Sequence, residues 1–296
     1  IVGTRTMGGR YLPALGARMG LDVPLLEDDT VAHHGASVFR LGIFLDAVMR
    51  RIGIRPDLVA GHSVGEWSGT VAAGIVPHER AGDLVAGLEL DEIELPDVDF
   101  AALAAGIDAV EPVVRDVPGV VVSHDNSPSQ SIVCGPPAQV ELALARLRDV
   151  NVLGYTLPFQ SGFHTPAIAP ALETVRGQAE SLPFGPAEIP MWSATVAGPY
   201  PPTRAEIIDL HLRHLVEPVR FRPMIERLHR DGGARIFVQV GIGSLTGFVD
   251  DTLGGTGGAG GAGHASVQVL SPKRSALAQL HRALTALWVE GLDVHP

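Results

Sequence analysis

Residues 61–65 read Gly-His-Ser-Val-Gly and lie between a short apolar run and a helical pattern. The apolar run at residues 57–60 predicts a buried strand, and residues 64–73 predict a helix that Gly74 can end. Glycines on both sides of Ser63 allow a sharp turn that leaves the serine on strained, exposed backbone. This order of strand, turn and helix predicts a nucleophile elbow. The alternative interpretation is a plain turn between two elements.

A serine nucleophile needs an oxyanion donor and a base, and the sequence offers a candidate for each. The helix that begins at Val64 directs its first N–H groups at Ser63, so the Val64 N–H is the candidate oxyanion donor. The chain has 12 histidines, of which His164 follows the end of a predicted strand. His164 is the candidate base, although by itself it would be read as a polar loop histidine.

Strands alternate with helices on both sides of a separate central segment. Residues 36–52 carry apolar side chains at helical spacing, and Gly53 can end that helix. Such alternation is typical of an α/β core. After the central segment we expect helices at residues 207–215, 223–230 and 276–288 and a strand at residues 235–240.

The central segment has the order strand, helix, strand, strand, helix, strand, which is that of a ferredoxin-like domain. The second and third strands should be joined across residues 126–128. We therefore predict an α/β core, formed by residues 1–98 and 166–296, with a ferredoxin-like subdomain inserted at residues 99–165. The expected strands are at residues 100–105, 120–122, 131–133 and 151–157, and the helices at residues 108–117 and 137–148.

Composition excludes several classes of function. The formal net charge of −11 argues against a nucleic-acid partner, because such a surface needs concentrated basic charge. Apolar stretches are broken before they reach roughly 18 residues, so neither a membrane span nor a membrane partner is expected. No signal peptide is evident, and the single Cys134 predicts a cytoplasmic location and a buried side chain. The chain begins at Ile1 rather than methionine, which suggests a piece of a longer polypeptide.

One histidine pair has the spacing of metal ligands on a helix. His211 and His214 are three positions apart, but no carboxylate or cysteine partner is evident. A solvated helix face is therefore the favoured interpretation, and no metal site is predicted. Residues 254–261 are almost all glycine and predict a flexible surface loop.

Several motifs together resemble those of one enzyme family. Residues 61–66 resemble the nucleophile motif of the malonyl-CoA:acyl carrier protein transacylases and of the acyltransferase domains of polyketide and fatty acid synthases. Residues 163–166 resemble part of the motif that holds the family's catalytic histidine, and residues 126–128 resemble its segment beside the active site. Later landmarks are similar at residues 218–221 and 237–241, so the resemblance covers residues 30–290.

The resemblance implies a hydrolase-like α/β core with the inserted subdomain, and an active site in the cleft between them. It implies a ping-pong reaction in which Ser63 takes a short acyl group from coenzyme A while His164 moves the proton. A backbone carbonyl would orient His164, with residues 239–243 as its candidate source. The substrate is then an acyl-CoA thioester, no cofactor is bound, and the partners are an acyl carrier protein and neighbouring synthase domains. The implied substrate-binding residues are His62, Leu88, Asn126 and Phe163.

The chain departs from the family pattern in two places. Family members carry a Gly/Gln-rich segment near the N-terminus, and here only Met7 and Gly8 resemble the residues that follow it, so we expect an N-terminal strand to be missing from this sequence. Members that accept malonyl or methylmalonyl carry an arginine about 25 residues after the serine, which pairs with the free carboxylate. Leu88 stands there and favours acetyl, whereas Phe163 resembles malonyl-selective members, so both acyl groups stay open.

Two other classes of function share these features. A serine thioesterase or esterase would use the same elbow, with water in place of the carrier protein. A non-catalytic scaffold domain would explain the missing N-terminal segment, although the intact Ser63 and His164 argue against it. Acyl transfer is therefore the leading hypothesis.

Overall fold

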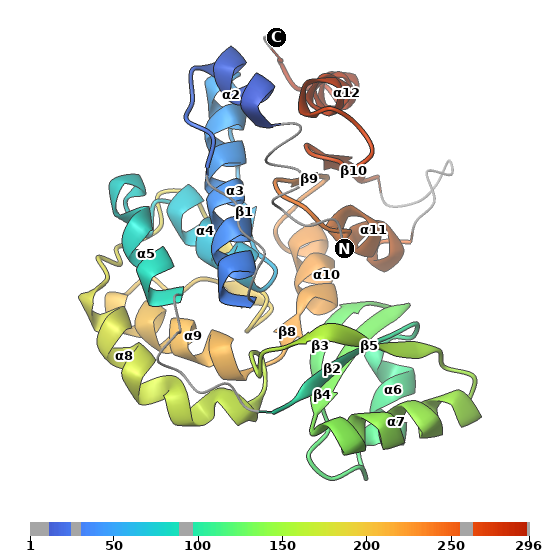
Figure 1. The fold of residues 1–296 in the computed structure, drawn as a ribbon. Helices are drawn as coiled ribbons and strands as arrows, with labels where there is room; N and C mark the ends of the chain where they lie inside the picture. Colours follow the sequence, from blue (N-terminus) through green and yellow to red (C-terminus); the bar gives the residue numbers. More distant parts are fainter. Residues whose placement is uncertain (1–11, 25–30, 89–96, 255–262, 295–296) are drawn as a thin grey trace.

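The computed structural model describes residues 12–24, 31–88, 97–254 and 263–294, whose helices and strands are shown in Figure 1. The helices are α2 (Leu12–Met19), α3 (Val31–Arg51), α4 (Val64–Ala72), α5 (Ala81–Leu88), α6 (Ile107–Val114), α7 (Pro137–Asp149), α8 (Leu172–Ser181), α9 (Arg204–Val216), α10 (Phe221–Arg230), α11 (Leu245–Thr252) and α12 (Ala276–Val289). The strands are β1 (Val59–Ala60), β2 (Asp99–Leu103), β3 (Val121–Ser127), β4 (Gln130–Gly135), β5 (Gly154–Gln160), β6 (Met191–Ser193), β7 (Gly198–Pro199), β8 (Val219–Arg220), β9 (Ile236–Gln239) and β10 (Ala265–Gln268). Within these described ranges, no helix is both long and apolar enough to cross a membrane.

The core is organised around α3, which buries apolar side chains against two sets of neighbours (Figure 1). Phe39 packs with residues of α4, α8 and α9, while Leu41 and Leu45 pack with residues of α2, β10 and α12. Each of the three side chains is at most 1% exposed, so the burial of each contributes about 1.5–3 kcal/mol. Helix α3 thereby joins the helices on both sides into one unit.

Two short sheets complete the core, and in one of them β7 pairs antiparallel with β6. Strand β1 pairs in parallel with β6, where Val59 lies opposite Met191, and β9 pairs in parallel with β10. Parallel pairs need crossover connections, which the intervening segments supply. The strand predicted at residues 57–60 shortens to Val59–Ala60, because the chain is bent at residues 57–58, and Ala60 is exposed rather than buried. Its end leads directly into the turn that carries Ser63.

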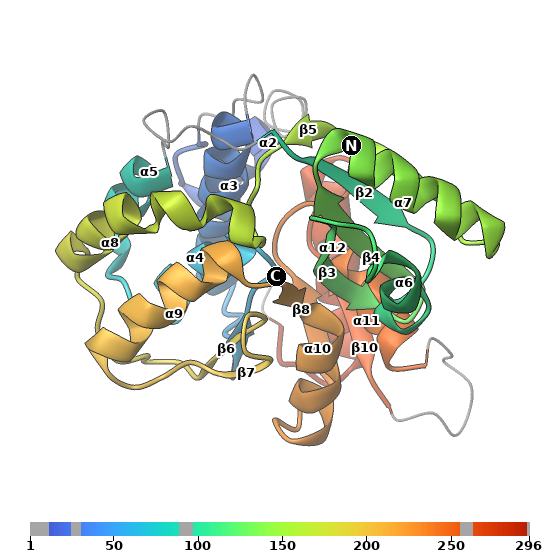
Figure 2. The same ribbon diagram turned by 90° about the horizontal axis from the view of Figure 1, so that it is seen from below.

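The third sheet has five strands in the order β5-β2-β4-β3-β8, and α6 and α7 cover one of its faces (Figure 2). Its first four strands have the arrangement of the predicted ferredoxin-like subdomain. Val110 and Val114 of α6 pack with Val140 and Leu147 of α7 to form its apolar layer. We propose residues 99–165 as its limits, and those limits stay a prediction.

The structure corrects two predicted details of the subdomain. Asn126 and Ser127 belong to β3 rather than to the turn, which lies at residues 128–129. The last strand begins at Gly154 rather than at residue 151, because the chain turns after α7 through Asn151, whose φ is 62°. Asparagine tolerates this left-handed backbone better than most residues do. Cys134 is buried in β4 as predicted, and burial raises the pKa of its thiol to about 12.

Contacts between the subdomain and the core gather on β3 and on the turn that follows it. Strand β8 lies outside the predicted subdomain, yet it pairs in parallel with β3. The Arg222 side chain donates hydrogen bonds to both carboxylate oxygens of Asp125, at 2.9 and 3.2 Å. The Asp251 carboxylate accepts hydrogen bonds from the N–H of Ser129 at 3.0 Å and from its hydroxyl at 2.7 Å. These three contacts fix the subdomain against the core.

Candidate active site

Ser63 lies at the turn between β1 and α4 on strained backbone. Its φ of 52° and ψ of −128° cost a non-glycine residue about 1–3 kcal/mol. Gly61 is required there, because a Cβ at this position would lie 2.2 Å from the backbone N of Glu66. An added Cβ at Gly65 would meet no atom within 4 Å, so packing does not require the second glycine of the pattern. The close backbone approach at this turn therefore requires the first glycine only.

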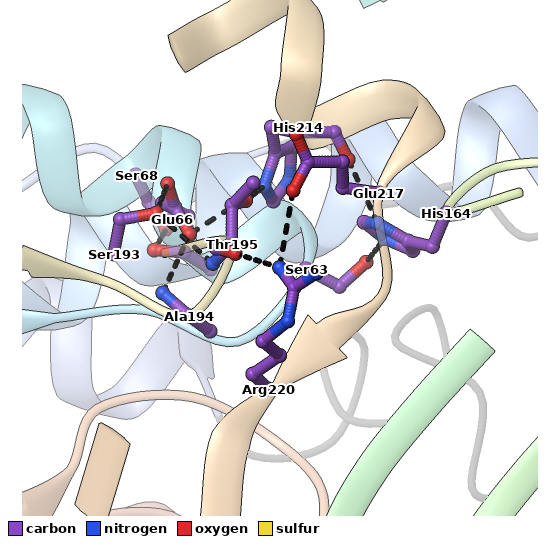
Figure 3. Close-up of polar contacts among 11 residues, drawn as sticks. Ser63, Glu66, Ser68, His164, Ser193, Ala194, Thr195, His214, Glu217 and Arg220 are labelled. Atoms are coloured by element: carbon purple, nitrogen blue, oxygen red, sulfur yellow. Dashed lines mark hydrogen bonds and ion pairs between the residues drawn. The ribbon is translucent and has the colours of Figure 1, made fainter. Parts of the chain in front are cut away.

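His164 meets the serine across the candidate site. Its Nε2 lies 2.7 Å from Ser63 Oγ, although the two residues are 101 positions apart (Figure 3). His164 also has a left-handed backbone, with φ of 62°, and it follows Gly162, whose φ is 77°. The Thr165 hydroxyl donates a hydrogen bond to the Gly162 carbonyl at 2.7 Å and closes this second tight turn.

Two carbonyl groups at the C-terminal end of α9 hold His164. Its backbone N–H donates to the Leu215 carbonyl at 2.7 Å, and its ring Nδ1 lies 2.9 Å from the His214 carbonyl. A carbonyl only accepts hydrogen bonds, so Nδ1 carries the ring hydrogen. Nε2 is then left as the acceptor for the Ser63 hydroxyl.

The prediction that residues 239–243 orient His164 is wrong. The orienting carbonyl belongs to His214, and carbonyls in the last turn of a helix have no partner within that helix. The Gln239 side chain instead accepts a hydrogen bond from the N–H of Thr246 at 3.1 Å. The loop at residues 239–243 therefore supports the start of α11.

Burial keeps the His164 imidazole neutral at pH 7. The residue is 5% exposed, and this burial is the main cause that lowers the pKa of His164 well below its ordinary value. Three neighbouring histidines lower this pKa further, and the backbone hydrogen bond opposes them. A neutral imidazole is the form that accepts a proton. The three neighbours are His214, His124 and His62.

Two of the four predicted substrate-binding residues contact each other. His62 Nε2 lies 2.7 Å from the side-chain oxygen of Asn126, whose amide nitrogen donates to the Gln130 side chain at 2.5 Å. Burial lowers the pKa of His62, so its neutral ring donates Nε2–H to that amide oxygen. This contact joins the turn at Ser63 to strand β3 of the subdomain.

The other two predicted substrate-binding residues are less closely defined. Phe163 is half-buried and packs against the apolar cluster that contains Phe39. Leu88 is the last residue of α5, and its side chain lies outside the described part of the structure. Residues 1–11 and residues 255–261 of the predicted glycine loop also lie outside it.

The predicted solvated face at His211 and His214 is wrong. The two residues are 4% and 3% exposed, and the His211 ring lies against Trp67 with 4.7 Å between ring centroids. His214 Nδ1 lies 3.4 Å from a carboxyl oxygen of Glu66. No group of three or more His, Cys, Asp or Glu side chains within the described residues could hold a metal ion. Sequence reasoning included Glu66 only as part of the motif at residues 61–66 and missed its contact with His214.

Comparison with known proteins identifies the family. The family model described as "Acyl transferase domain" matches residues 25–282, which include Ser63, His164 and the whole subdomain. The chain belongs to the acyl transferase domain family. The predicted resemblance is confirmed.

Relatives of this acyl transferase domain include two mycobacterial synthases. It is 30% identical over 182 residues to a phenolphthiocerol/phthiocerol polyketide synthase of Mycobacterium tuberculosis, across 61% of this chain and 10% of that synthase. It is 28% identical over 287 residues to the phenolphthiocerol synthesis polyketide synthase type I Pks15/1 of Mycobacterium marinum, across 96% of this chain and 13% of that synthase. The chain thus spans 10–13% of the length of these relatives.

Solved structures confirm the fold class. The acyltransferase domain from the second module of the salinomycin polyketide synthase matches with a TM-score of 0.80 at 24% identity, covering 99% of this chain and 69% of that one. The acyl-carrier-protein S-malonyltransferase of Burkholderia pseudomallei matches with a TM-score of 0.78 at 20% identity, covering 96% and 95%. The acyl transferase domain therefore has the predicted hydrolase-like α/β core with a smaller ferredoxin-like subdomain.

Proposed function

We propose that this acyl transferase domain moves a short acyl group from a coenzyme A thioester to the phosphopantetheine thiol of an acyl carrier protein. The observation that carries the proposal is the 2.7 Å contact between Ser63 Oγ and His164 Nε2 at the strained turn. The names of the relatives favour the same chemistry, since one is a polyketide synthase and one an acyl-carrier-protein S-malonyltransferase. Neighbouring synthase domains would then be further partners.

The reaction has two half-reactions through an ester on Ser63. In the first, His164 Nε2 takes the hydroxyl proton, Ser63 Oγ attacks the thioester carbonyl carbon, and the C–S bond breaks. The coenzyme A sulfur leaves with the proton from Nε2. In the second, the carrier thiol gives its proton to Nε2 and attacks the ester, and Ser63 Oγ leaves and recovers that proton.

The negative charge on the carbonyl oxygen needs a donor beside Ser63. The Val64 N–H suits this role because Val64 is the first residue of α4, and the first amides of a helix have no carbonyl partner within it. Helix N-termini also favour negative charge. Val64 therefore remains the proposed oxyanion donor, and His62 and Asn126 remain proposed parts of the substrate-binding site.

Labelled acyl-CoA separates this proposal from its alternatives. A transferase should form an acyl-Ser63 ester that persists without a carrier protein and disappears when the carrier protein is added. A thioesterase or esterase would release free acid in both cases. A scaffold domain would take up no label, which would contradict acyl transfer.

Acylation should remain fast at mildly acidic pH. His164 acts as a base only when neutral, and its pKa lies well below the ordinary 6.5 because of burial and neighbouring histidines. A lower pKa keeps the base in its neutral, active form down to a lower pH. The rate of Ser63 acylation should therefore not fall to half its maximum at pH 6.5. Intact-protein mass spectrometry can follow the rate of Ser63 acylation by acyl-CoA from about pH 5 to 8, the range in which histidine titrates. The midpoint of that rate gives the pKa of the base. A midpoint near 6.5 would contradict a buried base.

The preferred acyl group depends on which side chain contacts the end of the acyl chain, where malonyl carries a free carboxylate. If Leu88 occupies the position of the carboxylate-binding arginine, malonyl-CoA must bury an unpaired carboxylate, at a cost of several kcal/mol. We then expect acetyl-CoA to acylate Ser63 faster than malonyl-CoA does, and Leu88→Arg to reverse that order. Competition between the two thioesters for one pool of protein measures the preference.

Leu88→Gln is the matched control for this test, because it adds a polar side chain without a positive charge. It should not favour malonyl-CoA. A wild-type preference for malonyl-CoA would show that another group meets the carboxylate, with Arg220 as the first candidate. The Arg220 side chain is 41% exposed and lies 3.1 Å from Glu217 at the edge of the site in Figure 3.

A further inference from the structure

Glu66 is a fully buried acidic residue on the helix that begins immediately after Ser63. Its residue exposure is 0%, and its backbone N–H donates to the Ser63 carbonyl at 2.7 Å. One carboxyl oxygen accepts a hydrogen bond from the Ser193 hydroxyl at 2.6 Å, and the other accepts from the Ala194 N–H at 3.2 Å (Figure 3). Burial of a carboxyl group is costly unless such donors surround it. These donors fix the carboxyl group in one position.

The same carboxyl group lies against the residue that orients the candidate base. His214 Nδ1 is 3.4 Å from Glu66 Oε2 and 3.0 Å from the Thr195 hydroxyl. His214 in turn contacts His164 twice. Its carbonyl lies 2.9 Å from His164 Nδ1, and its ring meets the His164 ring edge-to-face with 4.9 Å between centroids. A displacement of His214 would therefore move His164.

We propose that Glu66 is a positioning residue that aligns the nucleophile and the base with each other. Its helix begins immediately after Ser63, its carboxyl group lies 3.4 Å from the His214 ring, and the His214 carbonyl binds His164. One side chain thus connects the supports of both reacting groups, which come from α4 and from the end of α9. This proposal rests on the proposed acyl transfer. It adds a positioning role for Glu66 that is separate from the roles of Ser63 and His164 in the reaction.

Variants at Glu66 test this role by kinetics. Glu66→Ala should lower kcat for acyl transfer roughly 10- to 100-fold, because small misplacements of reacting groups carry penalties of that size. The KM for acyl-CoA should change less than about 2-fold, since the Glu66 side chain is fully buried. Glu66→Gln keeps the shape and one of the two acceptor oxygens, so it should recover most of the loss.

Thr70→Val is the matched control on the same helix. Thr70 is 1% exposed and its hydroxyl donates to the Trp67 carbonyl at 2.7 Å, and among the described residues no hydrogen bond or ion pair joins it to His214. It should lower thermal stability without lowering kcat. If Glu66→Ala and Thr70→Val lose kcat in proportion to their loss of stability, the role of Glu66 is structural only and the proposal is overturned.

A double-mutant cycle with His214→Gln tests the route through His214. His214→Gln keeps the backbone carbonyl and removes the ring that Glu66 holds. If Glu66 acts through this ring, the double variant with Glu66→Ala should lose no more kcat than the worse single variant. Multiplied losses would contradict the route. If Glu66→Ala does not fold, the kcat values of Thr195→Val and His214→Gln test the proposal instead. An unchanged kcat in both variants overturns it.

A fluorophosphonate probe distinguishes failure of this inference from failure of the proposed function. The probe reacts with an activated serine and needs neither coenzyme A nor a carrier protein. A wild-type protein that takes up no acyl group from acyl-CoA would contradict acyl transfer, whatever Glu66 does. A wild-type protein that is acylated, together with folded Glu66 variants that react with both reagents at the wild-type rate, would contradict the positioning role alone.

Discussion

Ser63→Ala should abolish acylation by acyl-CoA thioesters. Ser63 Oγ is the atom 2.7 Å from His164 Nε2, and alanine leaves no atom there to form the ester. Loss of a serine nucleophile costs about 10⁶-fold in rate, so no acyl adduct should be detectable by intact-protein mass spectrometry. In the wild type, peptide mapping should place the adduct on the peptide that contains Ser63.

Ser68→Ala is the control for this experiment. Ser68 lies on the same helix, and its hydroxyl donates to the Gly65 carbonyl at 3.2 Å. This variant should be acylated at the wild-type rate. Ser63→Ala should also remain folded, because alanine, like serine, has a Cβ and so adds no backbone strain at the φ of 52°. An acyl label that persists in folded Ser63→Ala would show that another residue is the nucleophile.

His164→Ala should slow acylation by about 10²–10⁴-fold, the usual range for loss of a general base. The rate should fall because alanine has no ring nitrogen to accept the Ser63 proton. In the wild type the His214 carbonyl binds Nδ1–H, which leaves Nε2 as that acceptor. An acidic residue fills the same orienting role in other serine enzymes. The rate of acyl-Ser63 formation at saturating acyl-CoA measures the loss.

His78→Ala is the matched histidine control. His78 is exposed in the 3₁₀ helix His78–Arg80, so its replacement should not change the acylation rate. His164→Ala removes a ring that packs beside the His214 ring, so the folding of this variant has to be checked. Circular dichroism should show that it is folded. Full acylation activity in His164→Ala, with another histidine essential, would contradict the assigned base.

The parts of the fold that sequence predicted correctly depend on local patterns. The helix over 137–148 became Pro137–Asp149, and the turn at Ser63 requires Gly61 because its backbone approaches Glu66. Both follow from the preferences of neighbouring residues, which a single sequence contains. The pairing of Ser63 with His164 spans two turns far apart in the chain, and it was expected only through resemblance to a family.

The parts that sequence did not predict depend on partners brought together by the fold. Strand β8 is two residues long and has no strand pattern of its own, and it forms because β3 offers an open edge. The sequence favours a solvated face for His214 because no carboxylate or cysteine partner is evident in it. In the structure it is buried, since Glu66 and Thr195 supply the contacts that water would otherwise supply. Composition and spacing do not reveal such partners.

Exchange of acyl transferase parts between synthases is restricted by the way β3 is shared. Residues 99–165 are continuous in the chain, so a chimera could be joined at only two points. Such a graft would still cross a hydrogen-bonded sheet, because the fifth strand belongs to the recipient. It would have to match the recipient groups on that side of the junction, or leave them unpaired. The recipient side consists of β8, Arg222, Asp251 and His62. Compatibility between donor and recipient is therefore decided along β3 and the turn after it rather than at the two joints.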